Sequence, residues 1–531
     1  MAKSVLQAHR EHQKVSNSPL LQTQSGAANT LCCSCWGYTF ELTPEHLTPE
    51  QSDKLKYTYD VLGEECLKRL NEISPPPDSA LPRNNGAQLQ EQAQRDRRKR
   101  ADSAMEDNQD SQRQEPDQEK AKTYSEAPAH RDLYALLRDH YKEDEKLQQL
   151  WTELNTIPEW VDWDQIARGQ EVFYRYGSAI LTGLAYQSLL GGMGAARVVE
   201  VLARTGGFST KVARRRLYET TQHILQCTKS LESIQPGGVG FASTVRVRLL
   251  HAAVRMRIMK LAAQRPDYYS VEKYGIPIND LDSIATIGTF SGTLIWLSLP
   301  RQGIYLREQE ITDYIALWRY IAYLVGCPTE YFEKSEQAKQ VMETLLLYEV
   351  HPSDTSGVLA NNIILSLKDK PPTWASADML IASARWLNGN DLCDALQLPR
   401  PSLYYWALMA GQCFFQIIFT YPYRLMPEWD KAKIERLRKI FYTLIVESKT
   451  GLGGKETMFE FQYVPEFNTV TEMGKDGKAE VSERGVDKRN LKYFLIGVTG
   501  LAATGWCTAK LVSLTFRGAV GALGYAWHML R

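Results

Sequence analysis

The chain has 531 residues, 44% of them hydrophobic and 10% aromatic, which is enough to build a large buried core. Lys and Arg together number 62, as do Asp and Glu, so no overall charge favours nucleic acid as a partner. The nine cysteines have no repeated spacing and the N-terminus lacks a continuous apolar stretch. These features predict an intracellular protein without a disulfide framework.

Residues 1–82 are expected to form an N-terminal tail with one helix. Thr48, Pro49 and Gln51 have the pattern of an N-cap, a first-turn proline and a capping box. Apolar residues then recur at helical spacing as far as Leu70, which predicts a helix that packs on another element.

Three cysteines cluster ahead of this helix, at Cys32, Cys33 and Cys35. Such a cluster could bind a metal or carry a palmitoyl group. Surface thiols in a tail are the simpler interpretation, and we adopt it as the expectation.

Residues 83–125 are predicted to form a disordered linker. Between Arg83 and Lys122 there is no aromatic residue, valine or isoleucine, so the stretch cannot bury enough apolar surface to offset its ordering entropy. The basic run at 95–100 could be a nuclear signal, although a solvated charge run is the simpler interpretation.

Residues 126–448 are predicted to form a helical catalytic domain. Apolar residues recur at three- and four-residue steps, glycine or proline marks most breaks, and alternating strand patterns are scarce. No Gly-rich phosphate loop and no Gly-x-Ser-x-Gly elbow is present, which disfavours nucleotide-dependent enzymes and serine hydrolases. The fold class is therefore expected to be all-α.

The C-terminal region divides into a polar connection at 449–490 and an apolar helical segment at 491–531. The run Tyr493–Ala509 has no charge, and glycines recur at three-residue steps further on. Two interpretations stay open: a membrane-associated hairpin formed by 493–530, or an amphipathic cover over the catalytic domain.

His251 is the histidine whose surroundings point to chemistry. On a helix it shares an apolar face with Val247, Val254 and Ile258. A buried imidazole must satisfy both ring nitrogens, by hydrogen bonds alone or by one bond and a metal. A satisfied core histidine is the ordinary interpretation. The surplus of arginines on the flanks favours a cofactor with carboxylates, such as haem: Arg246, Arg248, Arg255 and Arg257.

The helix before it presents polar groups along one side: Arg216, Glu219, Thr220 and His223. Glu219 and His223 could ligate a non-haem metal, or Glu219 could form a weak surface ion pair with Arg216. One helix earlier, Glu200 lies between two arginines at ionic spacing, which fits either a solvated pair or a functional acid. These patterns alone leave the reaction open.

A series of motifs resembles the rubber-oxygenase family, which includes latex-clearing proteins and the ER-bound oxygenase MpaB of mycophenolic acid biosynthesis. The likeness runs from about Trp160 to Pro328, with a weaker continuation to Pro399. The motifs occur in one order: Thr244-x-Arg-x-Arg-Leu-Leu-His251-Ala-x-Val-Arg255, Gly275-Ile-Pro-Ile-Asn279, Thr286-Ile-Gly-Thr-Phe290-Ser291, Trp318-Arg-Tyr-Ile321 with Gly326, and Leu387-Asn-Gly389-x-x-Leu392-x-x-Ala395-Leu-x-Leu-Pro399.

The resemblance implies a globin-like helical domain in which His251 is the ligand of haem b iron. It places the proposed catalytic base at Glu200 and two distal-pocket residues at Arg216 and Thr220. The residue before the threonine departs from the family: latex-clearing proteins have a lysine there, and this chain has Glu219. That difference makes rubber a poor expectation for the substrate.

The expected function is therefore a haem-dependent oxygenase that uses dioxygen to cleave a double bond in an apolar, isoprenoid or lipid-like substrate. On charge grounds, Arg248, Arg255 and Arg319 are the candidates to pair with the haem propionates. Rival interpretations are a haem-carrying sensor or carrier without turnover, and a structural helical protein on a membrane surface. Association with the ER membrane through 493–530 is a further expectation.

Overall fold

The computed structural model describes residues 31–76, 131–205, 208–210 and 212–459, and parts of 491–515. The predicted linker and most of the predicted polar connection lie outside these residues. Within the described part the all-α prediction is confirmed, since its only sheet is a two-stranded hairpin.

The elements of the first half run in this order: β1 (Leu31–Cys35), β2 (Tyr38–Leu42), α2 (Pro49–Leu55), α3 (Val61–Ile73), α5 (Leu133–His140), α6 (Glu145–Asn155), α7 (Trp163–Arg175), α8 (Gly177–Gly183), the π-helix η2 (Leu184–Leu190), the 3₁₀-helix η3 (Gly191–Gly194), α9 (Ala196–Thr205), α10 (Ala213–Cys227), α11 (Leu231–Ile234) and α12 (Val239–Gln264).

The second half continues with η4 (Pro266–Tyr268), α13 (Val271–Tyr274), α14 (Asp280–Phe290), the π-helix η5 (Leu294–Ser298), α15 (Leu299–Arg301), α16 (Glu308–Val325), η6 (Glu330–Phe332), α17 (Ser335–Tyr348), α18 (Asp354–Leu367), α19 (Ala377–Ala395), α20 (Leu403–Arg424), α21 (Pro427–Tyr442) and η7 (Thr443–Glu447).

The N-terminal hairpin corrects the expectation for the cysteine cluster. Strands β1 and β2 pair antiparallel around a turn at Trp36 and Gly37, where both residues have positive φ, as two-residue hairpin turns require. Side chains alternate across a strand, so Cys33 and Cys35 both point into the core and are fully buried. The surface-thiol interpretation was wrong for these two residues.

The predicted helix after the hairpin is two helices. Thr48 and Gln51 form the predicted capping box at the start of α2, but the chain leaves the helix at Lys56 and starts α3 at the N-cap Asp60. The expected packing of this region on another element is confirmed, because apolar side chains of residues 31–76 belong to the same core clusters as the main body.

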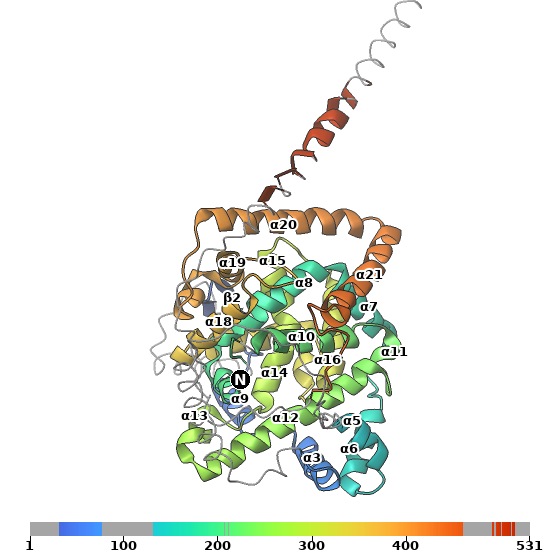
Figure 1. The fold of residues 1–531 in the computed structure, drawn as a ribbon, viewed down its shortest axis with the longest axis vertical. Helices are drawn as coiled ribbons and strands as arrows, with labels where there is room; N and C mark the ends of the chain where they lie inside the picture. Colours follow the sequence, from blue (N-terminus) through green and yellow to red (C-terminus); the bar gives the residue numbers. More distant parts are fainter. Residues whose placement is uncertain are drawn as a thin grey trace, which may run out of the picture.

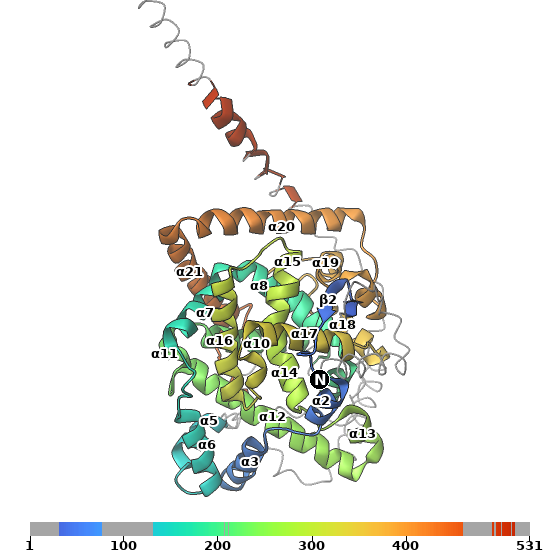
Figure 2. The same ribbon diagram turned by 180° about the vertical axis from the view of Figure 1, so that it is seen from behind.

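The main body is organised around long buried helices (Figures 1 and 2). Helix α7 packs closely against α16, and only glycine fits at Gly169, because a Cβ there would lie 2.4 Å from the Asp313 carbonyl oxygen. Helix α12 crosses the lower end of the molecule, and α20 lies across the opposite end, with α21 descending along the side.

The described residues of 491–515 are helical and project away from the body beyond α20 (Figure 1, red). Their described side chains are almost all exposed, so they do not form the cover over the catalytic domain that was one of the two expectations. No single helix of the described part is long and apolar enough to cross a membrane. The bent pair Asp280–Phe290 and Leu294–Arg301 passes that test together, with a 41° bend.

Candidate functional site

A cavity of about 540 Å³ lies between α9, α10, α12, α14 and η2. Its volume falls within the roughly 300–1,000 Å³ of small-molecule and cofactor sites. The wall is mostly apolar, and two aromatic rings in it, Phe290 and Trp318, stack with their centroids 4.8 Å apart. Both rings come from predicted family motifs, which explains why those motifs carry aromatic residues at these positions.

His251 lies on the wall of this cavity. Val247 and Val254 line the same wall, as the helical spacing predicted, because α12 is continuous through the motif. Neither ring nitrogen of His251 has a hydrogen-bond partner among the described residues. Burial, with a smaller contribution from Arg255, lowers the pKa of His251 to about 4. The imidazole is therefore neutral at physiological pH, the form that ligates metals.

A second histidine, His223 of α10, lines the same cavity. One ring nitrogen, Nδ1, lies 3.0 Å from the Ser243 hydroxyl oxygen, and the ring makes an edge-on contact with Phe459. Burial, with a smaller contribution from the nearby His251, lowers the pKa of His223 to about 4. Sequence reasoning considered His223 only beside Glu219 as a non-haem ligand; the structure places it with His251 instead.

The side of α10 predicted to be functional does face the cavity: Arg216, Glu219 and Thr220 all line it. Glu219 accepts a hydrogen bond from Arg215 at 3.0 Å, so the ion pair considered with Arg216 does not form. The Arg216 guanidinium has no partner among the described residues. It therefore presents an uncompensated positive charge at the cavity.

Glu200 does not line the cavity. Its neighbours Val201 and Leu202 do, while the Glu200 carboxylate forms an ion pair with Arg204 one turn further along α9. This is the ion pair that the spacing allowed, although both side chains are mostly buried and not solvated as expected. A role for Glu200 as the base stays a prediction, and its placement does not support it.

The three predicted propionate partners also lie outside the cavity wall and have partners of their own. Arg248 makes two hydrogen bonds to the Asp60 carboxylate, at 2.7 and 2.8 Å, and one to Glu153 at 2.8 Å. Arg255 donates to the carbonyl oxygens of Pro277 and Ile278 and stacks on Tyr59, while Arg319 stacks on Trp160 and pairs with Glu333.

Gly326, which belongs to one of the family motifs, lies where a side chain would clash with the Arg248–Asp60 ion pair. It ends α16 in the left-handed region, with φ of 75°. A Cβ at this position would lie 2.7 Å from Arg248 Nε and 2.8 Å from the Asp60 carboxylate carbon. The glycine is therefore required by the ion pair that holds α3 on α12, and not by the cavity.

Three charged residues that line the cavity were not predicted from the sequence: Arg301, Asp282 and Glu349. Arg301 lines it and donates to the carbonyl oxygens of Trp36 and Leu387, and burial lowers its pKa. Asp282 and Glu349 also line it and both bind Arg197. Burial raises the pKa of Asp282 to about 6, against the opposing effect of Arg197.

No group of three or more His, Cys, Asp or Glu side chains within the described ranges could hold a metal ion. The pair Glu219 and His223 would need further ligands to form a non-haem iron site, which typically has two histidines and a carboxylate. A haem iron needs only one protein ligand on one side, and His251 on the cavity wall could serve as that ligand. The residues of the cavity therefore fit a haem better than a bare iron ion.

Part of the chain that includes most of the cavity residues matches a known family model. Residues 174–413 match the model of the ER-bound oxygenase mpaB/B'/rubber oxygenase catalytic domain. This part of the chain, a little under half of its length, is similar to that catalytic domain. The predicted resemblance is thereby confirmed, and the matched residues include both cavity histidines and the cavity side of α10.

Two individual proteins are also similar to this chain. A solved structure of latex-clearing protein in its closed state superposes with a TM-score of 0.44 at 17% identity, covering 56% of this chain and 79% of that one. Aurantioclavine synthase cnsA of Penicillium expansum is 58% identical over 33 residues, which is 6% of this chain and 7% of that protein. The match thus spans only a small fraction of the length of this curated relative.

Proposed function

We propose that this protein is a haem b-dependent oxygenase that uses dioxygen to cleave a carbon–carbon double bond in an apolar, isoprenoid-type substrate. The observation that carries the proposal is the neutral, unpartnered imidazole of His251 on the wall of an apolar cavity inside the catalytic domain. The imidazole is half-buried and opens onto the cavity, so a cofactor in the cavity can reach a ring nitrogen that no described residue occupies.

His251 would hold the haem iron through a ring nitrogen. The cavity arginines without an acidic partner, Arg216 and Arg301, are better candidates for the propionates than Arg248, Arg255 or Arg319, because the charges of those three are already satisfied within the scaffold. When bound, the haem supplies the binding and activation of dioxygen.

The remaining cavity residues suit an apolar alkene. Phe290, Trp318 and the aliphatic wall would orient the chain and exclude water from it. Glu219 and Thr220 supply a carboxylate and a hydroxyl at the α10 side, where a proton could be taken up or delivered. Glu219 is the acid we assign to this role, since Glu200 lies outside the wall.

The proposal is tested by measuring oxygen uptake with farnesyl- and geranyl-bearing lipids and by identifying the products by mass spectrometry. We expect oxygen consumption coupled to loss of the alkene and formation of carbonyl products. His251→Ala should abolish this activity, whereas His140→Ala, which changes an exposed histidine paired with Glu143, should retain it. Haem bound by the wild type without oxygen use on any substrate would favour the sensor or carrier interpretation.

A further inference from the structure

Helix α20 exposes large apolar side chains to solvent. Its buried side is mixed, with Met409 and Cys413 beside Gln416 and Thr420, and the neighbouring Gln412 donates to the Thr182 hydroxyl on α8 at 3.3 Å. Its solvent side carries Phe415 and Phe419, which are 52% and 47% exposed. A surface helix of a soluble protein buries its apolar stripe and exposes its polar one.

The exposed apolar residues continue around the corner from α20 to α21. Leu425 is 79% exposed and Trp429 is 59% exposed, and the rings of Phe415, Phe419 and Tyr423 stack in a row with centroid distances of 4.7 and 5.9 Å. We name this surface the α20 face and define it by Leu403, Phe414, Phe415, Phe419, Leu425 and Trp429. A gathering of exposed large apolar side chains along one helix and the corner that follows it is typical of an interaction site.

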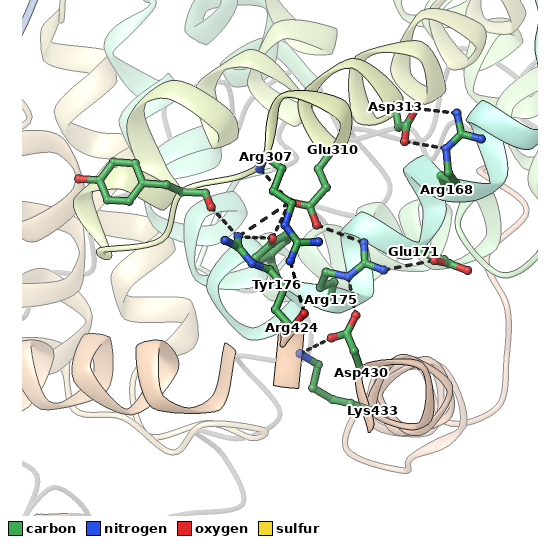
Figure 3. A network of polar contacts seen from close by, with 11 residues as sticks. Arg168, Glu171, Arg175, Tyr176, Arg307, Glu310, Asp313, Arg424, Asp430 and Lys433 are labelled. Carbon is green, nitrogen blue, oxygen red and sulfur yellow. Dashed lines mark hydrogen bonds and ion pairs between the residues drawn. The ribbon is translucent and has the colours of Figure 1, made fainter. Parts of the chain in front are cut away.

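The α20 face is held rigidly in its outward orientation. At the end of α20, Arg424 donates to the Tyr176 hydroxyl at 2.9 Å, and that hydroxyl donates to Glu310 at 2.7 Å (Figure 3). At the start of α21, Asp430 accepts from Arg175 at 2.5 Å. These bonds tie both helices to α7 and α16, so α20 cannot rotate to bury its aromatic side.

The charges and the neighbouring chain indicate what covers this face. Helix α20 has no acidic residue, and its single charged residue is Arg424. The described C-terminal segment leaves the body at the same end (Figures 1 and 2), and it also exposes large apolar side chains: Leu495, Ile496, Trp506 and Val512. Exposed lysine and arginine residues follow on α21, and Lys431, Arg436 and Lys439 pair with no carboxylate of the described part.

We propose that the α20 face lies on a lipid bilayer, with α20 in the plane of the interface. An apolar and aromatic side flanked by basic residues is the composition of helices that rest on a membrane, and Trp429 and Tyr423 are of the type that lies at headgroup level. The cavity lies one helix away, because α8 contacts α20 through Thr182 and lines the cavity through Leu181. An apolar substrate dissolved in the bilayer would therefore have a short path to the site.

Flotation of the purified full chain with vesicles tests this placement, using phosphatidylcholine alone and a mixture with phosphatidylserine. We expect the wild type to float with both and more strongly with the anionic mixture. The double variant Phe415→Glu/Phe419→Glu should reduce the vesicle-bound fraction at least about tenfold, since two aromatic side chains lose their burial in lipid. The matched control is Ile73→Glu/Ile157→Glu. Both residues are exposed and apolar: Ile73 is the last residue of α3 and Ile157 follows the end of α6, and these two helices lie at the opposite end of the molecule from α20.

Circular dichroism and thermal unfolding of each variant would establish that it folds like the wild type. The proposal is overturned if the wild type does not bind vesicles, or if the α20 variant binds as well as the wild type. It is also overturned if the lipid-free protein is a dimer that the α20 variant converts to a monomer while vesicle binding is absent, because the face would then join two copies of the chain.

Discussion

The cavity wall and the scaffold around it differ in how completely their charged and polar groups are paired. In the scaffold, Arg248 holds the carboxylates of both Asp60 and Glu153. The cavity wall is mixed: Asp282 and Glu349 bind Arg197 and Glu219 binds Arg215, whereas His251 and Arg216 have no partner among the described residues. These two groups are therefore free to meet a ligand in the cavity, whereas the paired arginines account for how the helices are held.

Among the paired residues of the scaffold, we expect substitution of Arg248 to cause the largest loss of stability. Arg248→Met leaves the Asp60 carboxylate without its buried partner, and breaking a buried ion pair costs about 3–5 kcal/mol. We expect a loss of this size in the free energy of unfolding, measured by urea denaturation. Arg400→Met removes an exposed arginine that pairs with Asp394, and should have a much smaller effect, because solvent screens an exposed ion pair. Equal effects of the two changes would mean that burial of the ion pair contributes nothing.

Substitutions of Glu219 and Glu200 test whether a carboxylate must line the cavity to contribute to turnover. Glu219→Gln removes the carboxylate on the wall, and turnover should fall by about 10²-fold, the lower end of a general acid–base contribution. Glu200→Gln removes a carboxylate that lies off the wall in an ion pair with Arg204, and turnover should change less than about tenfold. Steady-state oxygen uptake at saturating substrate measures both. The opposite order would restore Glu200 as the base.

Burial of the His223 imidazole should make the free energy of unfolding depend on pH, which is the smallest of the expected effects. Its folded pKa of about 4 lies below the ordinary value of 6.5, so the unfolded chain binds the proton more readily. The stability of the folded state is therefore complete above pH 6.5 and is lost as pH falls toward 4. At pH 5 one such histidine costs up to about 2 kcal/mol.

Replacing His223 by glutamine removes this loss of stability at low pH, because glutamine does not titrate. We expect His223→Gln to lose less stability than the wild type between pH 8 and pH 5, measured by urea unfolding at both values. His140→Gln, at an exposed position, should follow the wild type. Identical pH dependence of wild type and His223→Gln would show that burial does not hold this imidazole neutral.

The sequence predicted the parts of the fold and site that depend on local periodicity. Val247, His251 and Val254 share a helical face whatever surrounds the helix, so their place on one wall could be read from spacing alone. The capping box at Thr48 is local in the same sense. The family motifs added the expectation of haem as the ligand, which periodicity could not supply.

Partners that are distant in the chain could not be predicted. Arg248 binds Asp60, which is 188 residues away, and nothing in the arginine-rich motif distinguishes that pair from a propionate contact. The spacing of Glu200 and Arg204 allowed either outcome. The hairpin at Cys33 and Cys35 was missed because its strands have five residues each, too short for a clear alternating pattern.

The central claim is tested most directly by the visible absorption spectrum of the purified full chain and its His251→Ala variant, each produced with haem supplied. We predict one b-type haem per chain in the wild type, with a Soret band, because His251 lines the cavity as a neutral imidazole without a partner. His251→Ala should lose the haem, and His140→Ala should keep it. A wild type that binds no haem, or a His251→Ala variant that keeps stoichiometric haem with an unchanged Soret band, would contradict the account.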